Sequence, residues 1–316
     1  MKLPPDFEIA RRLPPSGSSL EPAQNYTRWL AKHHYENFTV ASYLLPRHLR
    51  QHFYNVYAYC RWADDLADEV SDPKVALELL NWWGEELRRC YEGSPDHPVF
   101  VALHTTIESF SIPKEPFEDL LTAFRRDQTT RRYSDWEAVV DYCRYSANPV
   151  GRLVLYLGGY RDKDRQTLSD FTCTALQLAN FWQDVARDLD KDRIYIPLDL
   201  LHAHGLTETD LFNKQFDQRY AGLMRELVLR TRVLFDQGLP LVEQVDAELR
   251  IDIELFSRGG LAVLDAIESI GYNTLRIRPA LSGRTKLRLL GLTYAKRYGI
   301  GSFLRALSQS RLDRSA

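Results

Sequence analysis

The chain has 316 residues, of which 44% are hydrophobic and 12% aromatic, so it is long enough to bury a large core. Its formal net charge of −2 excludes the strongly basic balance that is typical of nucleic-acid-binding proteins. The cysteines, at positions 60, 90, 143 and 173, form neither a CxxC pair nor a Cys/His group with zinc spacing. They predict reduced thiols in a cytoplasmic protein.

The N-terminal residues 1–22 are rich in Pro, Ser and Gly, and this composition predicts a flexible arm. The segment has no apolar stretch of the kind found in signal peptides. Nowhere in the chain do about 18 apolar residues follow one another, as a membrane-spanning helix would require. Peripheral contact with the inner membrane is left open by these observations.

Beyond the arm, apolar residues recur at the three- and four-residue spacing of helices, without the alternation that indicates strands. The periodicity is clear over residues 47–69, 169–189 and 219–249. No linker rich in Pro or Gly divides the remaining chain. We therefore expect a single all-α domain over residues 23–316, built as a helical bundle.

The first cluster of chemical interest is acidic and consists of Asp64, Asp65, Asp68 and Glu69. Carboxylates four residues apart lie on one face of a helix, one turn or about 6 Å from each other. A lone acidic run is most often a solvated helix face. Here the preceding turns are apolar and aromatic, and Arg61 lies one turn away, where it could neutralise a carboxylate or a phosphate.

A second row combines an amide with two carboxylates, Asn180, Asp184 and Asp188, again at four-residue spacing. The residues between them are largely apolar, so this polar stripe would carry a desolvation cost unless it had partners. Structural arginines such as Arg187 or Arg193 would be one solution. The other is Mg²⁺, a hard cation that binds carboxylates together with phosphate oxygens. Two such rows favour the metal interpretation and predict chemistry on a diphosphate.

Other candidates are weaker when each is taken alone. His34 lies in a mildly cationic segment, but a single histidine is more often a hydrogen-bonded structural residue. Tyr57, Tyr142 and Tyr272 could be ordinary core aromatics, or their hydroxyls and ring faces could stabilise a leaving group and a carbocation. The basic segment that follows Tyr272 is by default solvated, with a cap over diphosphate or a contact with an anionic membrane as the sharper alternatives.

Four motifs carry a resemblance to a known family: HHYENFTVASYLLP, YAYCRWADDLADE, YCRYSANPVG and LQLANFWQDVARDLDKDRIYIP. In this order and spacing they resemble the squalene/phytoene synthases, from about Asn25 to about Leu290. The resemblance implies an isoprenoid-synthase-type helical bundle with a central cavity. It also implies Mg²⁺ as the cofactor and a prenyl diphosphate as the substrate.

The resemblance further assigns roles to single residues. The implied metal ligands are Asp64 and Asp68 in the first row and Asn180, Asp184 and Asp188 in the second. The implied catalytic residues are Tyr57, Arg61 and Tyr142. The implied substrate contacts are His34, Phe38, Tyr57, Arg61, Gln183 and Tyr272.

Gln183 distinguishes branches of the family. Condensing members usually carry Arg directly before the first Asp of the second motif, so Gln183 removes one cation from the diphosphate site. NFWQD, HYENF and SANPVGR are similar to the hopanoid-pathway branch called HpnC, or hydroxysqualene synthase. That branch converts presqualene diphosphate and water into hydroxysqualene and diphosphate, and it implies pathway partners that make the former and reduce the latter.

Three alternative functions can be compared with the residues that each would require. Head-to-head condensation to presqualene diphosphate, squalene or phytoene is disfavoured by Gln183. A non-catalytic helical interaction protein would be marked by lost aspartates, whereas every expected position is filled. A di-iron bundle requires ExxH pairs, and the sequence has none.

Overall fold

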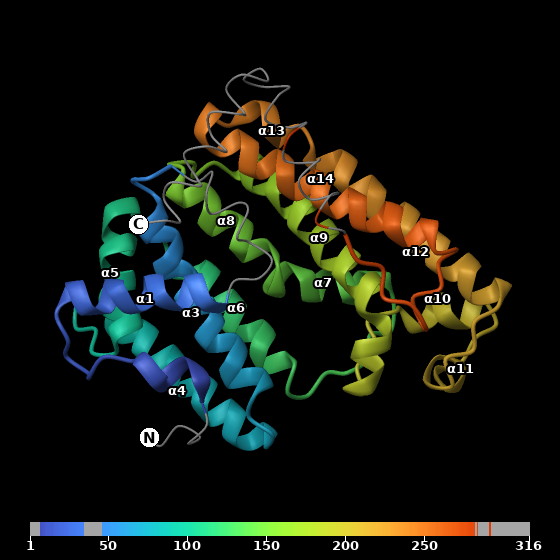
Figure 1. Cartoon of the computed structure of the whole chain (residues 1–316), viewed down its shortest axis with the longest axis horizontal. Coiled ribbons are helices and arrows are strands. Elements are labelled where there is room, and N and C mark those ends of the chain that lie inside the picture. The colour runs from blue at the N-terminus through green and yellow to red at the C-terminus, as the bar shows by residue number, and fades with distance from the viewer. Residues whose placement is uncertain (1–6, 35–45, 282, 284–290, 292–316) are drawn as a thin grey trace. The chain divides into compact units, whose positions relative to one another are not determined.

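The computed structural model describes residues 7–34, 46–281, 283 and 291, and its regular elements are helices (Figure 1). In chain order they are the 3₁₀ helix η1 (Glu8–Arg12) and the α-helices α1 (Leu20–His34), α3 (Arg50–Asp68), α4 (Pro73–Tyr91), α5 (Pro98–Phe110), α6 (Glu115–Arg126), α7 (Trp136–Ser146), α8 (Asn148–Leu157), α9 (Lys163–Asp190), α10 (Leu198–Ala203), α11 (Glu208–Phe212), α12 (Gln218–Gly238), α13 (Leu241–Gln244) and α14 (Ala247–Ser269). The only β-type pairing among the described residues is an isolated bridge between Arg132 and Ile194. The prediction of an all-α fold is confirmed.

The described residues group into two compact units, where the sequence predicts one domain over residues 23–316. Of the described residues, the first unit contains 7–34, 46–130 and 144–166. The second contains 131–143, 167–281, 283 and 291. The first acidic row belongs to the first unit and the second row to the second.

In the first unit, α3 is the central helix and packs against α1, α4, α5, α6 and α8. Its buried face carries Tyr59 and Trp62, both fully inaccessible to solvent. The Trp62 ring stacks on Trp83 of α4 with 5.2 Å between centroids, and Tyr59 meets Phe117 of α6 edge-on at 4.9 Å. Rings of this size contribute a large share of core stability, so α3 is held rigidly along its length.

The N-terminal segment is tied to this core. Phe7 and Ile9 are 4% and 1% exposed, although residues 1–22 are expected to form a flexible arm. The hydroxyl of Tyr26 donates to the Ile9 carbonyl at 2.7 Å and accepts from the Trp62 indole N–H at 2.8 Å. Burial of Phe7 and Ile9 offsets the entropy of ordering this Pro-rich stretch, within which η1 and the start of α1 form.

In the second unit, α9 packs close to α12 and α14. The indole N–H of Trp182 donates to the Thr231 hydroxyl at 2.8 Å, which joins α9 to α12. A Cβ atom at Gly260 of α14 would lie 2.8 Å from a methyl group of Leu176 on α9. The absence of a side chain at Gly260 thus allows the close approach of these two helices.

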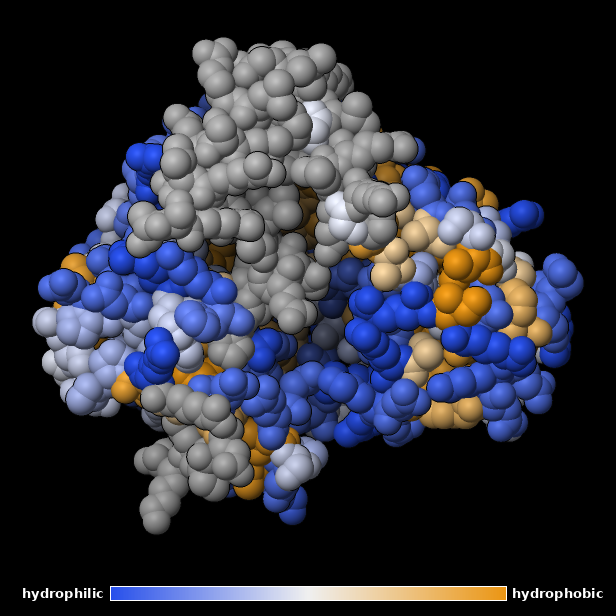
Figure 2. Space-filling model, viewed as in Figure 1, coloured by the Kyte–Doolittle hydropathy of each residue, from blue (hydrophilic) through white to orange (hydrophobic). Residues whose placement is uncertain are grey.

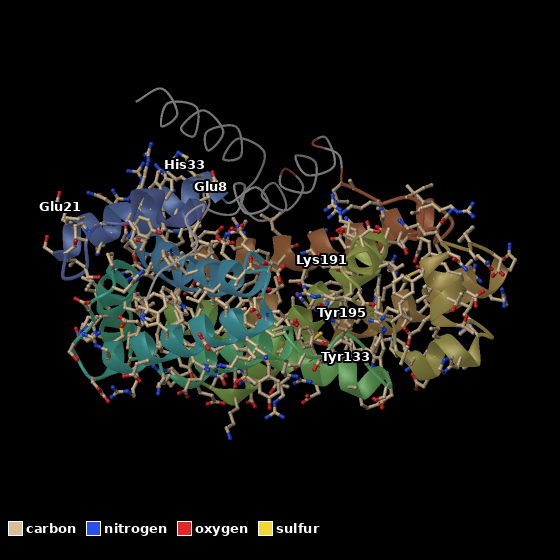
Figure 3. The ribbon with its side chains drawn as sticks, turned by 90° about the horizontal axis from the view of Figure 1, so that it is seen from below. Glu8, Glu21, His33, Tyr133, Lys191 and Tyr195 are labelled. Carbon is tan, nitrogen blue, oxygen red and sulfur yellow. The ribbon has the colours of Figure 1, made fainter. Side chains whose placement is uncertain are left out.

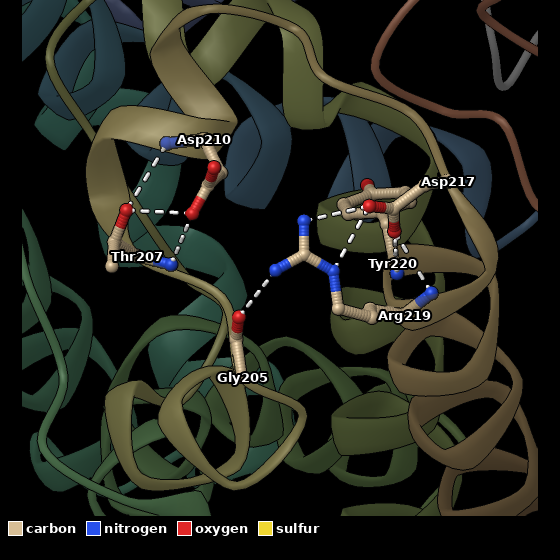
Figure 4. Close-up of polar contacts among 6 residues, drawn as sticks. All are labelled: Gly205, Thr207, Asp210, Asp217, Arg219 and Tyr220. Carbon is tan, nitrogen blue, oxygen red and sulfur yellow. Dashed lines mark hydrogen bonds and ion pairs between the residues drawn. The ribbon is translucent and has the colours of Figure 1, made fainter.

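Short caps fix the connection that leads into α12 (Figure 4). Thr207 and Asp210 form a capping box at the start of α11. Asp217 accepts from the backbone N–H groups of Arg219 and Tyr220, and it also pairs with the Arg219 guanidinium at 2.7 Å. Arg219 in turn donates to the Gly205 carbonyl at 2.7 Å, so one side chain links the α12 cap to the preceding loop. Such caps satisfy N–H groups that the first helical turn leaves without partners.

Among the described helices, none combines the length and the apolar character needed to span a bilayer. On the face shown in Figure 2, the apolar areas over α10–α12 are small and separated by hydrophilic side chains. The most exposed large apolar side chains on α12 are Leu229 and Val233, at 55% and 54%. All four cysteines are free thiols, and burial raises the pKa of Cys60 and Cys90 to about 12.

Candidate active site

The first acidic row lies at the C-terminal end of α3 and divides by burial. Asp65 is 2% exposed, Asp64 is half-buried and Asp68 is exposed. The four-residue spacing puts Asp64 and Asp68 on one accessible face of the helix, while Asp65 points into the core. The structure therefore separates the two carboxylates predicted to bind metal from a third that is structural.

Arg61 lies one turn before these carboxylates and contacts three of them. Its guanidinium is 2.5 Å from Asp65, 3.4 Å from Asp64 and 3.7 Å from Glu69. Burial raises the pKa of the Asp65 carboxyl to about 7, and the nearby Arg61 cation opposes this rise. Arg61 is thus held at the acidic row by Asp65, with 27% of its side chain still exposed.

Tyr57 lies one turn further back on α3, on the side of Arg61. Partial burial raises the pKa of its hydroxyl to about 12, and the Arg61 charge works in the opposite direction. The phenol therefore stays protonated at neutral pH and can donate a hydrogen bond. The first unit brings together Tyr57, Arg61 and Asp64 as the sequence predicts.

The second acidic row follows the accessible stripe of α9. Asn180 is exposed, and Asp184 and Asp188 are partly exposed. Phe181, Trp182 and Val185 on the other side of the helix are buried. The predicted ligand row is therefore an accessible oxygen-rich face on a helix anchored by its apolar side.

A cation from a distant part of the chain lies on this second row. Arg278, 94 residues from Asp184 in sequence, pairs with both of its carboxylate oxygens, one of them at 3.0 Å. The same guanidinium lies 3.5 Å from the Gln183 side-chain oxygen, and the Gln183 amide donates to the Pro279 carbonyl at 2.5 Å. Arg278 thus places a positive charge on the row from which Gln183 was expected to remove one. Sequence reasoning assigned Arg278 only to a basic segment.

Tyr142 belongs to an aromatic cluster on the second unit. Its ring lies 6.1 Å from Phe181 and 5.8 Å from Tyr195, and Phe181 stacks flat on Tyr195 at 3.7 Å. Tyr133 completes the cluster, at 5.6 Å from Tyr195 (Figure 3). The sequence indicates Tyr142 but not Tyr133 or Tyr195, which lie in connections outside the helices and have no periodicity to mark them.

The remaining predicted contacts are Tyr272, His34 and Phe38, and the structure describes the side chain of Tyr272 only. Tyr272 follows α14 with a left-handed backbone (φ 66°), and its ring faces the Arg225 guanidinium at 5.7 Å. His34 is the last residue of α1, and its side chain lies outside the described residues. Phe38 also lies outside them.

The squalene/phytoene synthase family profile matches residues 31–288 of the chain. The chain belongs to this family. The resemblance carried by the acidic motifs, Tyr142 and NFWQD is confirmed.

Three similar proteins locate the chain within the family. It is 36% identical to a hydroxysqualene synthase from Sinorhizobium fredii, over 86% of this chain and 89% of that protein. The crystal structure of the squalene synthase HpnC from Alicyclobacillus acidocaldarius is 45% identical, with a TM-score of 0.77 over 80% of this chain and 96% of that one. Phytoene synthase 2 from Oryza sativa is 28% identical, over 83% of this chain and 67% of that protein.

The donor set fits the magnesium ion that the family implies. In the described part of the chain, no three His, Cys, Asp or Glu side chains gather closely enough to bind a metal by themselves. Each row instead offers two carboxylates on an accessible stripe, and the second row adds the Asn180 amide. Mg²⁺ commonly takes only one or two protein carboxylates and completes its octahedron with phosphate oxygens and water. The ion pair between Arg278 and Asp184 also shows that a positive charge can bind at this row.

Proposed function

We propose that the chain is a hydroxysqualene synthase, which converts presqualene diphosphate and water into hydroxysqualene and diphosphate. The observation that carries the proposal is its 36% identity to an enzyme of that name across nearly the whole length of both proteins. The 45% identity to HpnC points to the same branch. Identity to the phytoene synthase is lower, at 28%.

In this proposal the acidic rows provide the ligands for the Mg²⁺ that binds the diphosphate, as the family implies. Mg²⁺ would be held by Asp64 and Asp68 of α3 and by Asn180, Asp184 and Asp188 of α9. When bound, it supplies Lewis-acid stabilisation of the charge that develops on the leaving diphosphate.

The chain's own donors act on the same group. Tyr57 is protonated because burial raises its pKa to about 12, so its hydroxyl donates to a diphosphate oxygen. Arg61 adds a fixed positive charge, since Asp65 holds its guanidinium in place from the buried side. The rings around Tyr142 offer electron-rich faces to a carbocation.

The proposed reaction balances without a redox cofactor. The carbon–oxygen bond to diphosphate breaks, and the electron pair leaves with the diphosphate. The cyclopropylcarbinyl cation rearranges in a site that restricts water. One water oxygen then bonds to the cation, and its proton passes to the released diphosphate.

A condensing prenyl synthase is the second candidate, and Arg278 is the observation that favours it. Gln183 argues against condensation only if the site lacks the corresponding cation, and Arg278 supplies one at 3.0 Å from Asp184. A non-catalytic interaction protein is less consistent with the chain, because the predicted ligand carboxylates Asp64, Asp68, Asp184 and Asp188 are all present on accessible helix faces. In the proposed pathway, one neighbouring enzyme supplies presqualene diphosphate and another reduces hydroxysqualene.

Product analysis tests the proposal. Purified protein with Mg²⁺ and without NADPH is given presqualene diphosphate or farnesyl diphosphate, and the extracts are analysed by mass spectrometry. We expect hydroxysqualene with an ¹⁸O label from H₂¹⁸O in the first case and no product in the second. Turnover of farnesyl diphosphate would establish a condensing synthase instead, and no turnover of either substrate would refute both enzymatic proposals.

A further inference from the structure

We infer that Arg278 is a diphosphate-binding residue and that Gln183 is the positioning residue that holds it over the second acidic row. The inference deepens the proposed function and rests on it. In this inference Gln183, which carries no charge itself, positions a cation that lies 95 residues further along the chain.

The anchor is the Gln183 side-chain amide. Its nitrogen donates to the Pro279 carbonyl at 2.5 Å, and its oxygen faces the Arg278 guanidinium at 3.5 Å. Gln183 is only 8% exposed, so its amide would be costly to leave without partners. The buried Gln183 amide therefore holds the Pro279 backbone through its nitrogen and the Arg278 guanidinium through its oxygen.

The segment leading to Arg278 is fixed at further points. The Thr274 and Tyr220 hydroxyls are 2.8 Å apart and both residues are fully buried. Leu275 is also fully buried, and Arg276 donates to the Lys214 carbonyl at 3.1 Å. These contacts hold the backbone of residues 274–279 against the second unit, while 37% of the Arg278 side chain remains exposed. Arg278 thus presents a partly exposed guanidinium from a fixed backbone.

The contact with Asp184 indicates what Arg278 recognises. A guanidinium that binds both oxygens of a carboxylate offers the same fork of donors to a phosphate. Arg187 also approaches Asp184, at 3.6 Å, but its side chain is 66% exposed and no buried amide positions it. When Asp184 takes part in metal binding, its charge is shared with the metal and the Arg278 donors become available to the diphosphate.

This assignment predicts opposite effects on two ligands. Arg278 competes with a metal for Asp184 but cooperates with a metal-bound anion. Replacing it by Gln should strengthen the binding of Mg²⁺ alone and weaken the binding of inorganic pyrophosphate in the presence of Mg²⁺. If Arg278 contributed only to packing, its replacement would not change the affinities for the two ligands in opposite directions.

The test is isothermal titration calorimetry on the full chain, with Mg²⁺ alone and with pyrophosphate at saturating Mg²⁺. We expect Arg278→Gln to weaken pyrophosphate binding about 10-fold or more, as for loss of a charge-assisted bidentate contact, with Arg278→Lys intermediate. The matched control is Arg230→Gln, which removes a partly exposed guanidinium of the second unit that pairs with Glu226 rather than with Asp184, and its pyrophosphate binding should stay within about 2-fold of wild type. Circular dichroism verifies that each variant is folded.

A double-mutant cycle separates the anchor from the cation. Gln183→Met keeps the length of the side chain but removes its amide, and should weaken pyrophosphate binding less than Arg278→Gln does. The double variant should bind no more weakly than Arg278→Gln alone, because Gln183 acts through Arg278. Additive losses would overturn the positioning role.

Pyrophosphate binding by Arg278→Gln that equals wild type would overturn the inference as a whole. This failure differs from failure of the proposed function, which is seen in the product analysis of the wild-type chain. A wild type that makes no hydroxysqualene, together with an Arg278→Gln variant impaired in pyrophosphate binding, would keep the inferred subsite and reject the reaction.

Discussion

The two acidic rows obtain their positive charges in different ways. In α3, Arg61 comes from the same helical turn and is held by the buried Asp65 at 2.5 Å. In α9, Arg278 comes from a segment 94 residues away and pairs with the accessible Asp184. The local cation is built into the core of its unit, whereas the remote one lies over an accessible carboxylate. The difference teaches that one row obtains its cation from local helix geometry and the other obtains it from tertiary structure.

The largest effect is expected from removing a ligand carboxylate of either row. Asp64→Ala and Asp184→Ala should each lower turnover by about 10³-fold or more, since each removes charge that acts on the leaving group. Both residues are accessible, so the helical circular dichroism signal should stay unchanged. The measurement is the rate of hydroxysqualene formation under saturating substrate.

Asp190→Ala is the matched control for these two variants. Asp190 is an exposed carboxylate on α9 that lies 3.6 Å from Lys214 and outside the predicted ligand row. It should keep nearly full turnover. Near-normal turnover in Asp64→Ala or Asp184→Ala would instead remove that row from the site.

Asp252 of α14 differs from Asp65 and Asp184 of the two rows, which have arginine partners. Neither of its carboxylate oxygens has a hydrogen-bond partner among the described residues. It is 2% exposed, and burial raises its pKa from 3.8 to about 8. Between pH 3.8 and about pH 8, Asp252 is protonated in the folded chain and ionised in the unfolded chain. The free energy of unfolding should therefore be highest at low pH in this window and fall as the pH rises through it.

Asp252→Asn should remove this dependence. Relative to wild type, the variant should gain about 2 to 4 kcal/mol of unfolding free energy between pH 5 and pH 8.5. Urea unfolding at the two pH values measures this difference. Parallel pH dependence in wild type and variant would show that Asp252 is ionised in the folded state.

The smallest effects concern the stability contributed by the two cations. Arg61→Met leaves the buried Asp65 without its partner and should lower the free energy of unfolding by about 2 kcal/mol, allowing for the partial exposure of Arg61. Arg278→Gln should lower it by about 0.5 kcal/mol or less, because both members of that pair are partly exposed. Urea unfolding at neutral pH compares the two variants.

Equal losses of stability in Arg61→Met and Arg278→Gln would contradict the distinction between the two rows. A larger loss in Arg278→Gln would indicate that the remote pair holds the fold of the second unit. In that case its proposed role toward a ligand would have to give way to a structural one.

The sequence predicts the parts of the site that depend on local spacing. The all-α fold, the accessible stripe of α9 and the contact between Arg61 and the first row all follow from helical periodicity. These features involve residues three to four positions apart, so the helix alone brings them together. The partition between accessible Asp64 and buried Asp65 is already less certain from sequence, because neighbouring acidic residues look alike until the packing of α3 is known.

The contacts that the sequence misses all depend on tertiary structure. No periodic pattern links Arg278 to Asp184, and Tyr195 reaches Phe181 from a connection after α9. The same limit applies to the N-terminal arm. Its Pro, Ser and Gly content suggests flexibility, yet two apolar residues, Phe7 and Ile9, are buried in the first unit.

The most direct test of the central claim is whether each acidic row takes part in binding a diphosphate. Pyrophosphate binding, measured by calorimetry, should require Mg²⁺ in the wild type. We predict that Asp64→Ala and Asp184→Ala each weaken this binding by about 10-fold or more, the size expected for loss of a charge-assisted interaction. Wild-type affinity in either variant would contradict the account.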